Sequence, residues 1–270
     1  MAKVSDIIKI MQEIAPECHT YKDGHDNVGL LVGKSDQTVT KVLCCLDASS
    51  QVLQEAIQLG CQLIVSHHPV VFYKLNVNDS TPSGRLLLNL VANNISVYSA
   101  HTNLDFVTDG INEYISKLLG IHDITPIESY IDSTQGFGRV GHLESPTTLI
   151  DFARLVSTRL QDDCVRIVGD KLKTISKIAV INGGGGGDTK YIDWAIKCGA
   201  DALVTADVKH HVAIYAQECG IALIEPQHYT SEHPYISVLK NRLNEACKKQ
   251  SLDIEIIQSL KDYNPRTLCK

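Results

Sequence analysis

The sequence lacks the paired cysteines of a disulfide framework or a zinc–thiolate site. It holds nine cysteines, an odd number, and none of them forms a Cys-x-x-Cys pair. Several stand inside apolar stretches, as Cys44 and Cys45 do within Val42–Leu46. We therefore expect reduced thiols that pack as small core residues, as in a protein of the cytosol or a similar reducing compartment.

Long apolar runs and an excess of positive charge are also missing. No apolar stretch approaches the roughly 18 residues that cross a membrane, and the opening MAKVSDIIKI does not have the pattern of a signal peptide. Lys and Arg number 25 against 31 Asp and Glu, which gives a formal net charge of −6. Without a basic field, neither nucleic acid nor membrane is expected as the main partner, although a substrate with a single phosphate remains compatible.

What the sequence does contain is an alternation of short apolar runs with helical patterns, which predicts an α/β fold. Its 270 residues suffice for one large domain or two small ones. Strands are expected at 38–46, 63–66, 95–100, 178–181, 203–205, 221–224 and 252–258. Helices are expected after Ser5 and at 49–59, 85–92, 110–119, 147–161, 189–197, 208–218 and 234–248, with 122–135 as a linker or a crossing segment.

An internal similarity divides the chain into two related halves. Glu55–His68 aligns with Trp194–Asp207, since each reads as a helix closed by glycine, a buried strand and polar residues. A looser match joins Ile95–His101 to Ile221–His228, and a generic βαβ rhythm is the alternative explanation. We expect two related α/β halves, each a sheet flanked by helices. The predicted division is 1–125 plus 228–270 for the first domain and 126–227 for the second.

Histidines and carboxylates gather where the predicted strands end. In open α/β sheets, ligands bind outside the carboxyl ends of the strands. Three of the four strand exits carry a histidine pair or a histidine with a carboxylate. The four exits are His67–His68, His101–Asp105, Ala206–Asp207 and His228–Glu232.

The adjacent pair His67 and His68 needs a special geometry to bind metal. Neighbouring residues on an extended strand point to opposite sides, so such a pair does not usually form a compact site. At a strand end the chain turns, and Pro69 would stiffen that turn. The alternative is a surface turn with two solvated histidines.

The other two exits space a histidine and a carboxylate by four residues. Asp105 follows His101 and is placed to bridge two metals, although it can also be a helix cap before Gly110. His228 and Glu232 would share one face of a short helix. Alternatively, Glu232 is a first-turn residue that favours the helix dipole.

This set of ligand types limits the metals and the chemistry. Imidazole and carboxylate without thiolate suit Zn, Fe(II), Mn, Co or Ni, and the sequence does not choose among them. Two divalent ions clamped by bridging carboxylates commonly activate water as a nucleophile. Hydrolysis is therefore the expected reaction class.

The chain resembles the Nif-three-like dinuclear-metal proteins, some of which are named GTP cyclohydrolase I type two. It looks like their short form, without the inserted domain that some members carry. The matching stretches run in order along most of the chain. They are Asp26–Gly33, Leu63–Val70, Ala100–Asp105, Gly136–Gly141, Ala202–Asp207 and Gln227–Glu232.

The resemblance implies a site, an assembly and an activity. Two divalent ions would be held by His67, His68, Asp105, His228 and Glu232. His101 would line the same pocket, and His101 or Glu232 would move a proton. The resemblance also implies a homohexamer and a nucleotide-type substrate, with GTP suggested by the family name. The alternatives are a non-catalytic metal-binding scaffold and a metal-dependent phosphoesterase.

Two glycine-rich segments carry further expectations. Gly136–Gly141 matches Gly-x-Gly-x-x-Gly, but the surrounding residues do not give the strand and helix of a dinucleotide site, so we expect a turn or a tight strand crossing. Gly183–Gly187 follows a strand and precedes a helix, where backbone N–H groups bind anions. A flexible turn or a subunit contact is the alternative there. A loop lying far from the metals would favour the scaffold.

Two departures from the family pattern bear on substrate preference. Thr205-Ala206-Asp207 stands where the family usually has Thr-Gly-Asp, and Pro226 fixes the approach to His228. Neither departure removes an expected ligand.

Overall fold

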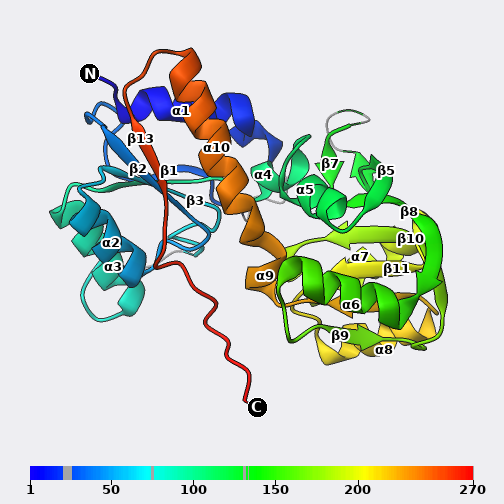
Figure 1. Cartoon of the computed structure of the whole chain (residues 1–270). Coiled ribbons are helices and arrows are strands. Elements are labelled where there is room, and N and C mark those ends of the chain that lie inside the picture. Colours follow the sequence, from blue (N-terminus) through cyan, green and yellow to red (C-terminus); the bar gives the residue numbers. More distant parts are fainter. Residues whose placement is uncertain (21–25, 74–75, 130–131, 133, 270) are drawn as a thin grey trace. The chain divides into compact units, whose positions relative to one another are not determined.

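The computed structural model describes residues 1–20, 26–73, 76–129, 132 and 134–269. The chain folds into two compact units (Figure 1). The first consists of Met1–Leu104 and Ile236–Tyr263, and the second of Asp105–Tyr235 and Asn264–Lys270. Each unit has its own sheet and its own buried core, as two domains of one chain would.

The first unit is built on a five-stranded sheet. Its order is β1 (Gly29–Val32), β4 (Ser96–Ser99), β3 (Leu63–Ser66), β2 (Lys41–Cys45) and β13 (Glu255–Gln258). The last four strands run parallel, and β1 is antiparallel to β4. Every residue of β3 and β4 is buried, as expected of parallel strands covered on both faces.

Helices cover the two faces of this sheet. Figure 1 shows α2 (Ser50–Leu59) and α3 (Pro82–Ala92) on one side, and α1 (Val4–Ile14) and α10 (Pro234–Lys249) on the other. A short 3-10 turn, Glu17–His19, follows α1. The local sequence sets the ends of α2: Ser49 caps its start by accepting the N–H of Val52, and Gly60 ends it with a left-handed φ of 69°.

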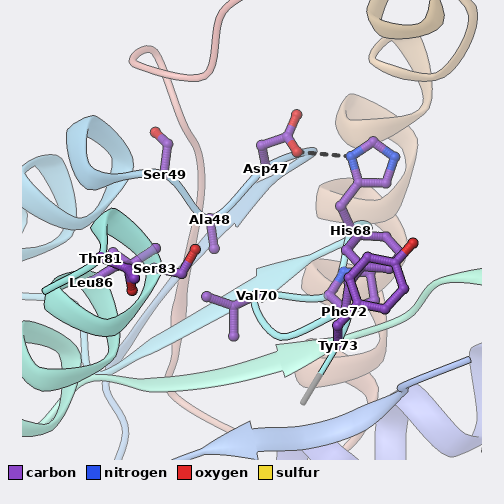
Figure 2. Close-up of a pocket in the computed structure, with 11 residues that line it drawn as sticks. Asp47, Ala48, Ser49, His68, Val70, Phe72, Tyr73, Thr81, Ser83 and Leu86 are labelled. Atoms are coloured by element: carbon purple, nitrogen blue, oxygen red, sulfur yellow. Dashed lines mark hydrogen bonds and ion pairs between the residues drawn. The ribbon is translucent and has the colours of Figure 1, made fainter. Parts of the chain in front are cut away.

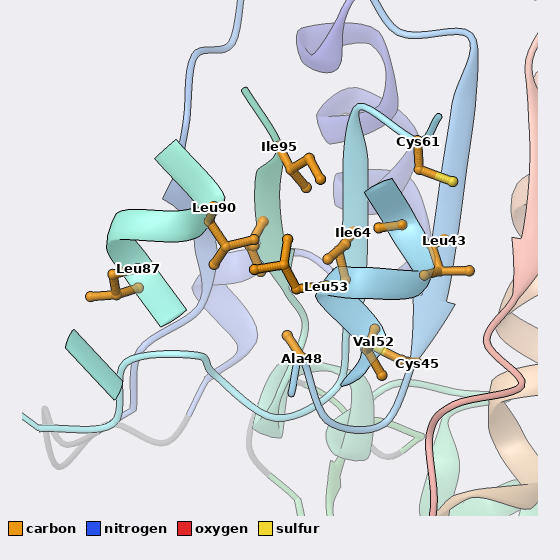
Figure 3. Packing of buried hydrophobic residues seen from close by; sticks show 12 residues of the cluster. Leu43, Cys45, Ala48, Val52, Leu53, Cys61, Ile64, Leu87, Leu90 and Ile95 are labelled. Carbon is orange, nitrogen blue, oxygen red and sulfur yellow. The ribbon is translucent and has the colours of Figure 1, made fainter. Parts of the chain in front are cut away.

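The core under α2 and α3 follows from the alternation of side chains along β2. Leu43 and Cys45 point to this side, where they pack with Val52 and Leu53 of α2 and Leu90 of α3 (Figure 3). The cysteines therefore serve as small apolar residues, and all nine in the chain are free thiols, as predicted.

The second unit contains a six-stranded mixed sheet. Its order is β5 (Ile121–Thr125), β8 (Arg139–Thr148), β10 (Thr174–Ile181), β11 (Ala202–Thr205), β12 (Ala222–Glu225) and β9 (Arg166–Val168). The central strands β10, β11 and β12 are parallel, and the outer strands are antiparallel to their neighbours. Two short strands, β6 (Glu128–Ser129) and β7 (Gly136–Phe137), pair separately.

The helices of this unit follow its strands closely. They are α5 (Ile111–Leu118), α6 (Leu149–Leu160), α7 (Lys190–Lys197), α8 (His210–Glu218) and α9 (His228–Glu232), with the 3-10 segment η2 (Gly183–Gly187). The short α4 (Thr102–Phe106) begins directly after His101. No helix in the described part of the chain is long and apolar enough to cross a membrane.

The two units repeat one β-α-β-α-β pattern, which confirms the prediction of two related halves. In the first unit the pattern is β2-α2-β3-α3-β4, and in the second it is β10-α7-β11-α8-β12. The alignment of Glu55–His68 with Trp194–Asp207 corresponds to α2-β3 and α7-β11. The histidines His67, His101 and His228 therefore follow parallel strands of these two patterns.

At 122–135, where a linker or a crossing segment without regular structure was expected, the structure has paired strands. This region contains β5 and β6, and β5 pairs with β8 through Ile121 opposite Leu143. Its exposed, polar edge position explains why apolar periodicity did not reveal it. The unit boundaries also differ from the predicted 125/126 and 227/228: β5 and α9 both belong to the second unit.

The Gly-x-Gly-x-x-Gly segment forms β7 and the start of β8, without a following helix, so it is not a dinucleotide site. A Cβ at Gly136 would lie 2.0 Å from the carbonyl oxygen of Glu128, and one at Gly141 would lie 2.3 Å from that of His122. These glycines permit tight strand crossings, as expected from the sequence.

Candidate metal centre

A histidine cluster stands at one end of the first unit's sheet. Strand β3 ends at Ser66 and is followed by His67 and His68, while β4 ends at Ser99 and is followed two residues later by His101. Because β3 and β4 are parallel, with Ser66 opposite Ser99, their carboxyl ends meet at one edge of the sheet. The sheet register therefore brings together histidines that are distant in sequence.

The three rings are close enough to share one ion. The centroid of His67 lies 5.0 Å from that of His68 and 5.2 Å from that of His101. One ligand nitrogen from each ring lies within 4.8 Å of those of the other two. His67 and His68 are adjacent, yet they do not diverge, because the strand has ended and the chain turns at this point.

Two of these histidines are oriented by aspartates. The Nδ1 atom of His68 lies 2.8 Å from Oδ1 of Asp47 (dashed line in Figure 2), and Nδ1 of His101 lies 2.7 Å from Oδ1 of Asp26. A carboxylate accepts a hydrogen bond, so each Nδ1 carries a proton, and in the neutral form of the ring Nε2 is the nitrogen with the free lone pair. Metal-binding histidines are typically oriented in this way.

His67 is oriented by the backbone instead. Its Nδ1 lies 2.8 Å from the carbonyl oxygen of Ala100, and its side chain is fully buried. A carbonyl only accepts, so His67 is also the tautomer that presents Nε2. All three histidines of the cluster therefore turn the same ring nitrogen toward coordination.

Asp26 connects the ring of His101 to the start of α4. Its carboxylate also accepts from the backbone N–H and the hydroxyl of Thr102. Burial raises the pKa of Asp26, but hydrogen bonds and charge from His101 and Thr102 outweigh burial, and the net pKa is lowered. The aspartate therefore stays ionised and holds His101 in one orientation.

The second unit carries a histidine–glutamate pair on α9. His228 and Glu232 are separated by one helical turn, and His228 Nε2 lies 3.0 Å from Glu232 Oε2. His228 Nδ1 lies 2.7 Å from Oδ2 of Asp207. Burial lowers the pKa of His228, but Glu232 and Asp207 outweigh burial and raise it to about 10. Without a metal, His228 is therefore an imidazolium between two carboxylates.

Asp207 lies where the chain leaves β11 and adopts a left-handed φ of 53°. Aspartate tolerates this conformation better than most residues. Its second oxygen accepts from Arg266 at 3.0 Å. The hydrogen bond from His228 is the main cause that lowers the pKa of Asp207. Position 206 is alanine in this chain, where the family pattern has glycine. Asp207 nevertheless contacts His228.

A buried carboxylate also fixes the corner that leads into α9. Asp162 is 1% exposed and accepts the backbone N–H of Gln227 at 2.6 Å and the hydroxyl of Thr230 at 2.5 Å. Gln227 is the N-cap residue of α9, and its side chain makes no capping hydrogen bond. Asp162, which is distant in sequence, instead accepts the backbone N–H at the start of this helix. It thereby fixes the helix that carries His228 and Glu232.

The glycine loop η2 lies directly against this pair. A Cβ at Gly183 would stand 2.1 Å from Oε1 of Glu232 and 3.1 Å from Nε2 of His228. The backbone N–H of Gly183 also donates to the hydroxyl of Ser231 at 3.3 Å. The loop is therefore adjacent to the candidate ligands of the second unit. A loop remote from these ligands, which would have favoured a non-catalytic scaffold, is not what the structure has.

Asp105, the remaining candidate ligand, lies in α4. Its carbonyl oxygen accepts from Asn112 at 3.3 Å. The two residues after it are fixed by Arg139, which is 1% exposed and donates to the carbonyl oxygens of Phe106 and Val107. The segment that carries Asp105 is therefore held by a buried guanidinium.

The sequence did not identify the aspartates that orient the histidines. Asp26 and Asp47 were not among the candidate site residues, and Asp207 was noted only at a strand exit, although each is a buried or half-buried carboxylate facing an imidazole. Asp47 and Asp207 each come two residues after a parallel strand, which is a signal that a search of strand exits for carboxylates can use.

The fold and these residues define an α/β protein with histidine and glutamate groups able to bind a metal. Residues 2–265 match the family model of Duf34/NIF3 (NGG1p interacting factor 3). The chain belongs to this family. A Clostridium perfringens protein named "GTP cyclohydrolase 1 type 2 homolog" is 35% identical over 265 residues, covering 97% of this chain and 98% of that protein.

Solved structures agree with this assignment. A Staphylococcus aureus hypothetical protein has a TM-score of 0.90 and 29% sequence identity, with 99% of both chains covered. A Bacillus cereus protein related to NIF3 has a TM-score of 0.91 at 21% identity, again with 99% of both chains covered, and this likeness concerns the fold alone.

Proposed function

We propose that the chain is a metal-dependent hydrolase with a dinuclear centre. Two divalent ions would be held by His67, His68, Asp105, His228 and Glu232, the set implied by the family resemblance. The proposal brings the histidines of the first unit and the pair on α9 into one centre. The ions are of the Zn, Fe, Mn, Co or Ni type, because all the ligands are imidazoles and carboxylates.

One observation carries this proposal. Four histidines that follow strands of two separate sheets each have Nδ1 held by a carboxylate or a carbonyl, which leaves Nε2 as the atom that can coordinate an ion or, in His101, take up a proton. Such orientation by surrounding acceptors is the usual arrangement in protein metal sites. Solvated surface histidines would not need four separate buried or half-buried acceptors. The four histidines held in this way are His67, His68, His101 and His228.

When bound, two such ions supply charge that activates water and stabilises developing negative charge on a substrate. The chain's own groups would handle the proton. Glu232 is 3% exposed and held between His228 and Gly183, so its carboxylate can take up a proton at a fixed position. His101, oriented by Asp26, is the second candidate for this role.

The substrate we propose is of the nucleotide type. The relatives' name points to ring opening of GTP, which would release formate, whereas a phosphoesterase at the same site would release phosphate. The contact of η2 with Glu232 favours an enzyme over a non-catalytic scaffold, because a loop rich in backbone N–H groups beside the ligands offers donors to a substrate. We further propose a homohexamer, to be tested by light scattering of the metal-loaded protein.

Metal analysis and turnover test the function together. The wild type is expected to hold two ions per chain, and His68→Ala and Asp105→Ala to hold fewer. His142→Ala, which changes an exposed histidine on β8, is the matched control and is expected to keep both ions. Fewer than one ion per wild-type chain contradicts the dinuclear centre. Loaded protein that is inert on a nucleotide panel favours the scaffold.

A further inference from the structure

A pocket of about 510 Å³ opens beside His68 in the first unit (Figure 2). Its volume falls in the range of small-molecule binding sites. His68 and its partner Asp47 form part of the wall, so one side of the pocket is the candidate metal centre itself. A molecule that reacts at His68 therefore has room here for its non-reacting part.

Two exposed aromatic rings stand at this pocket. Phe72 is 45% exposed and Tyr73 is 84% exposed, and both line the cavity. The ring of Phe72 meets that of His101 edge-on at 5.3 Å, and Figure 2 shows Phe72 beside His68. Exposed rings next to a cavity are the usual means of binding a flat aromatic ligand by stacking.

The rest of the pocket lining combines hydroxyl groups, which can donate hydrogen bonds, with apolar side chains. Ser49 and Thr81 are helix caps whose oxygens accept the N–H groups of Val52 and Gly84. Each hydroxyl hydrogen therefore remains to be donated. Val70, Leu86 and the hydroxyl of Ser83 complete the surface. Such a wall suits a ring that carries acceptor atoms, namely carbonyl oxygens or ring nitrogens.

The charges at the pocket select against a polyphosphate. Among the described residues that line it there is no lysine or arginine, and Asp47 contributes a carboxylate. A chain of phosphates would meet this carboxylate, and no lysine or arginine among the described lining residues would compensate it. A neutral heterocycle meets no such cost.

We propose that this pocket binds a planar nitrogen heterocycle, of the purine or pterin type, stacked against Phe72 with its reacting edge toward His68. This inference deepens the proposed function, on which it rests for the role of His68. It assigns the ring of a nucleotide-type substrate to the first unit and makes Phe72 a specificity-determining residue.

Guanosine binding to metal-free protein tests the pocket directly. Calorimetry in EDTA is expected to detect guanosine binding to the wild type, and Phe72→Ala is expected to weaken it about tenfold, through loss of one stacking face. Phe72→Trp should retain binding, and Leu86→Trp should abolish it by filling the cavity. Tyr263→Ala, an exposed aromatic of the same unit outside the pocket, is the control.

Three results would overturn the inference. They are no guanosine binding to the wild type, equal binding by Phe72→Ala, and binding of ribose 5-phosphate as tight as that of guanosine. Thermal unfolding of each variant shows whether it has folded. The outcome is separable from the proposed function: guanosine binding that depends on Phe72, in a protein that holds no metal or turns over no nucleotide, keeps the pocket and rejects the hydrolase.

Discussion

In the second unit, Oε1 of Glu232 occupies the space in which a side chain at Gly183 would begin. A Cβ built on Gly183 would lie 2.1 Å from that oxygen, and the backbone there has a φ of 63°. Both the close approach and the left-handed conformation require glycine. The first glycine of the loop thus determines where the carboxylate of a candidate ligand lies.

Gly183→Ala is therefore expected to displace Glu232 and weaken metal binding. We expect metal affinity to fall at least tenfold and the free energy of unfolding to fall by about 1–2 kcal/mol. Gly184→Ala is the matched control, since a Cβ there meets nothing within 4 Å. Metal titration and thermal unfolding of both variants decide the matter. Equal metal affinity of the two variants would contradict the prediction.

Asp26→Asn tests the orientation of His101. An amide accepts a weaker hydrogen bond than a carboxylate and does not hold the imidazole in one tautomer, so we expect turnover to fall about 10- to 100-fold. Asp36→Asn changes an exposed aspartate of the same unit and is the control. Turnover of the metal-loaded proteins on the nucleotide panel measures the effect. If Asp26→Asn turns over substrate like Asp36→Asn, His101 and its aspartate have no role in proton transfer.

Metal binding is expected to release a proton from His228. The pKa of this imidazole is about 10 in the metal-free protein, so at pH 7.5 it is protonated, and an ion can bind Nε2 only after the proton leaves. Calorimetry in two buffers with different ionisation enthalpies should report about one proton from this residue. In Glu232→Gln the release should shrink, because the main group raising the pKa is gone. Undiminished release would assign the proton elsewhere.

Asp262 is expected to make the metal-free protein less stable as pH rises. Burial raises its pKa to about 6, and Asp47 adds to this against the lowering effect of the hydrogen bond from Leu46. The folded state therefore holds this proton more tightly than the unfolded state, where the pKa is about 3.9. Its stabilising contribution is complete below about pH 4 and is lost as pH rises through 6.

The loss should amount to about 2–3 kcal/mol. Asp262→Asn keeps an acceptor for Leu46 and removes the titration, so its unfolding free energy, measured by urea denaturation in EDTA, should change less between pH 4 and pH 7. Parallel pH profiles of the two proteins would show that Asp262 has no such role.

The sequence was informative where a single strand or helix carries the signal. Strand β3 was predicted to the residue, because its four apolar and small residues are fully buried between helices and are followed at once by His67 and His68. The i, i+4 spacing of His228 and Glu232 also predicted a shared helix face, and α9 provides it.

The remainder depends on contacts between distant segments. Asp26 reaches His101 across 75 positions of the chain, and no local pattern encodes that pairing. The edge strand β5 is largely exposed and owes its conformation to pairing with β8, so its side chains carry little periodicity. The role of Phe72 emerges only from the cavity that the segments following β2 and β3 enclose with the start of α3.

The position of β13 has a consequence for how the chain folds during synthesis. This strand pairs with β2 in parallel, Ile256 opposite Val42, and it is synthesised after every other strand of the two sheets. Until then the edge of β2 has no neighbour on that side, and α10 is not yet available to cover the sheet. All six strands of the second unit's sheet lie between residues 121 and 225. The second unit should therefore close its sheet first, while the sheet of the first unit is completed only after β13 has been synthesised.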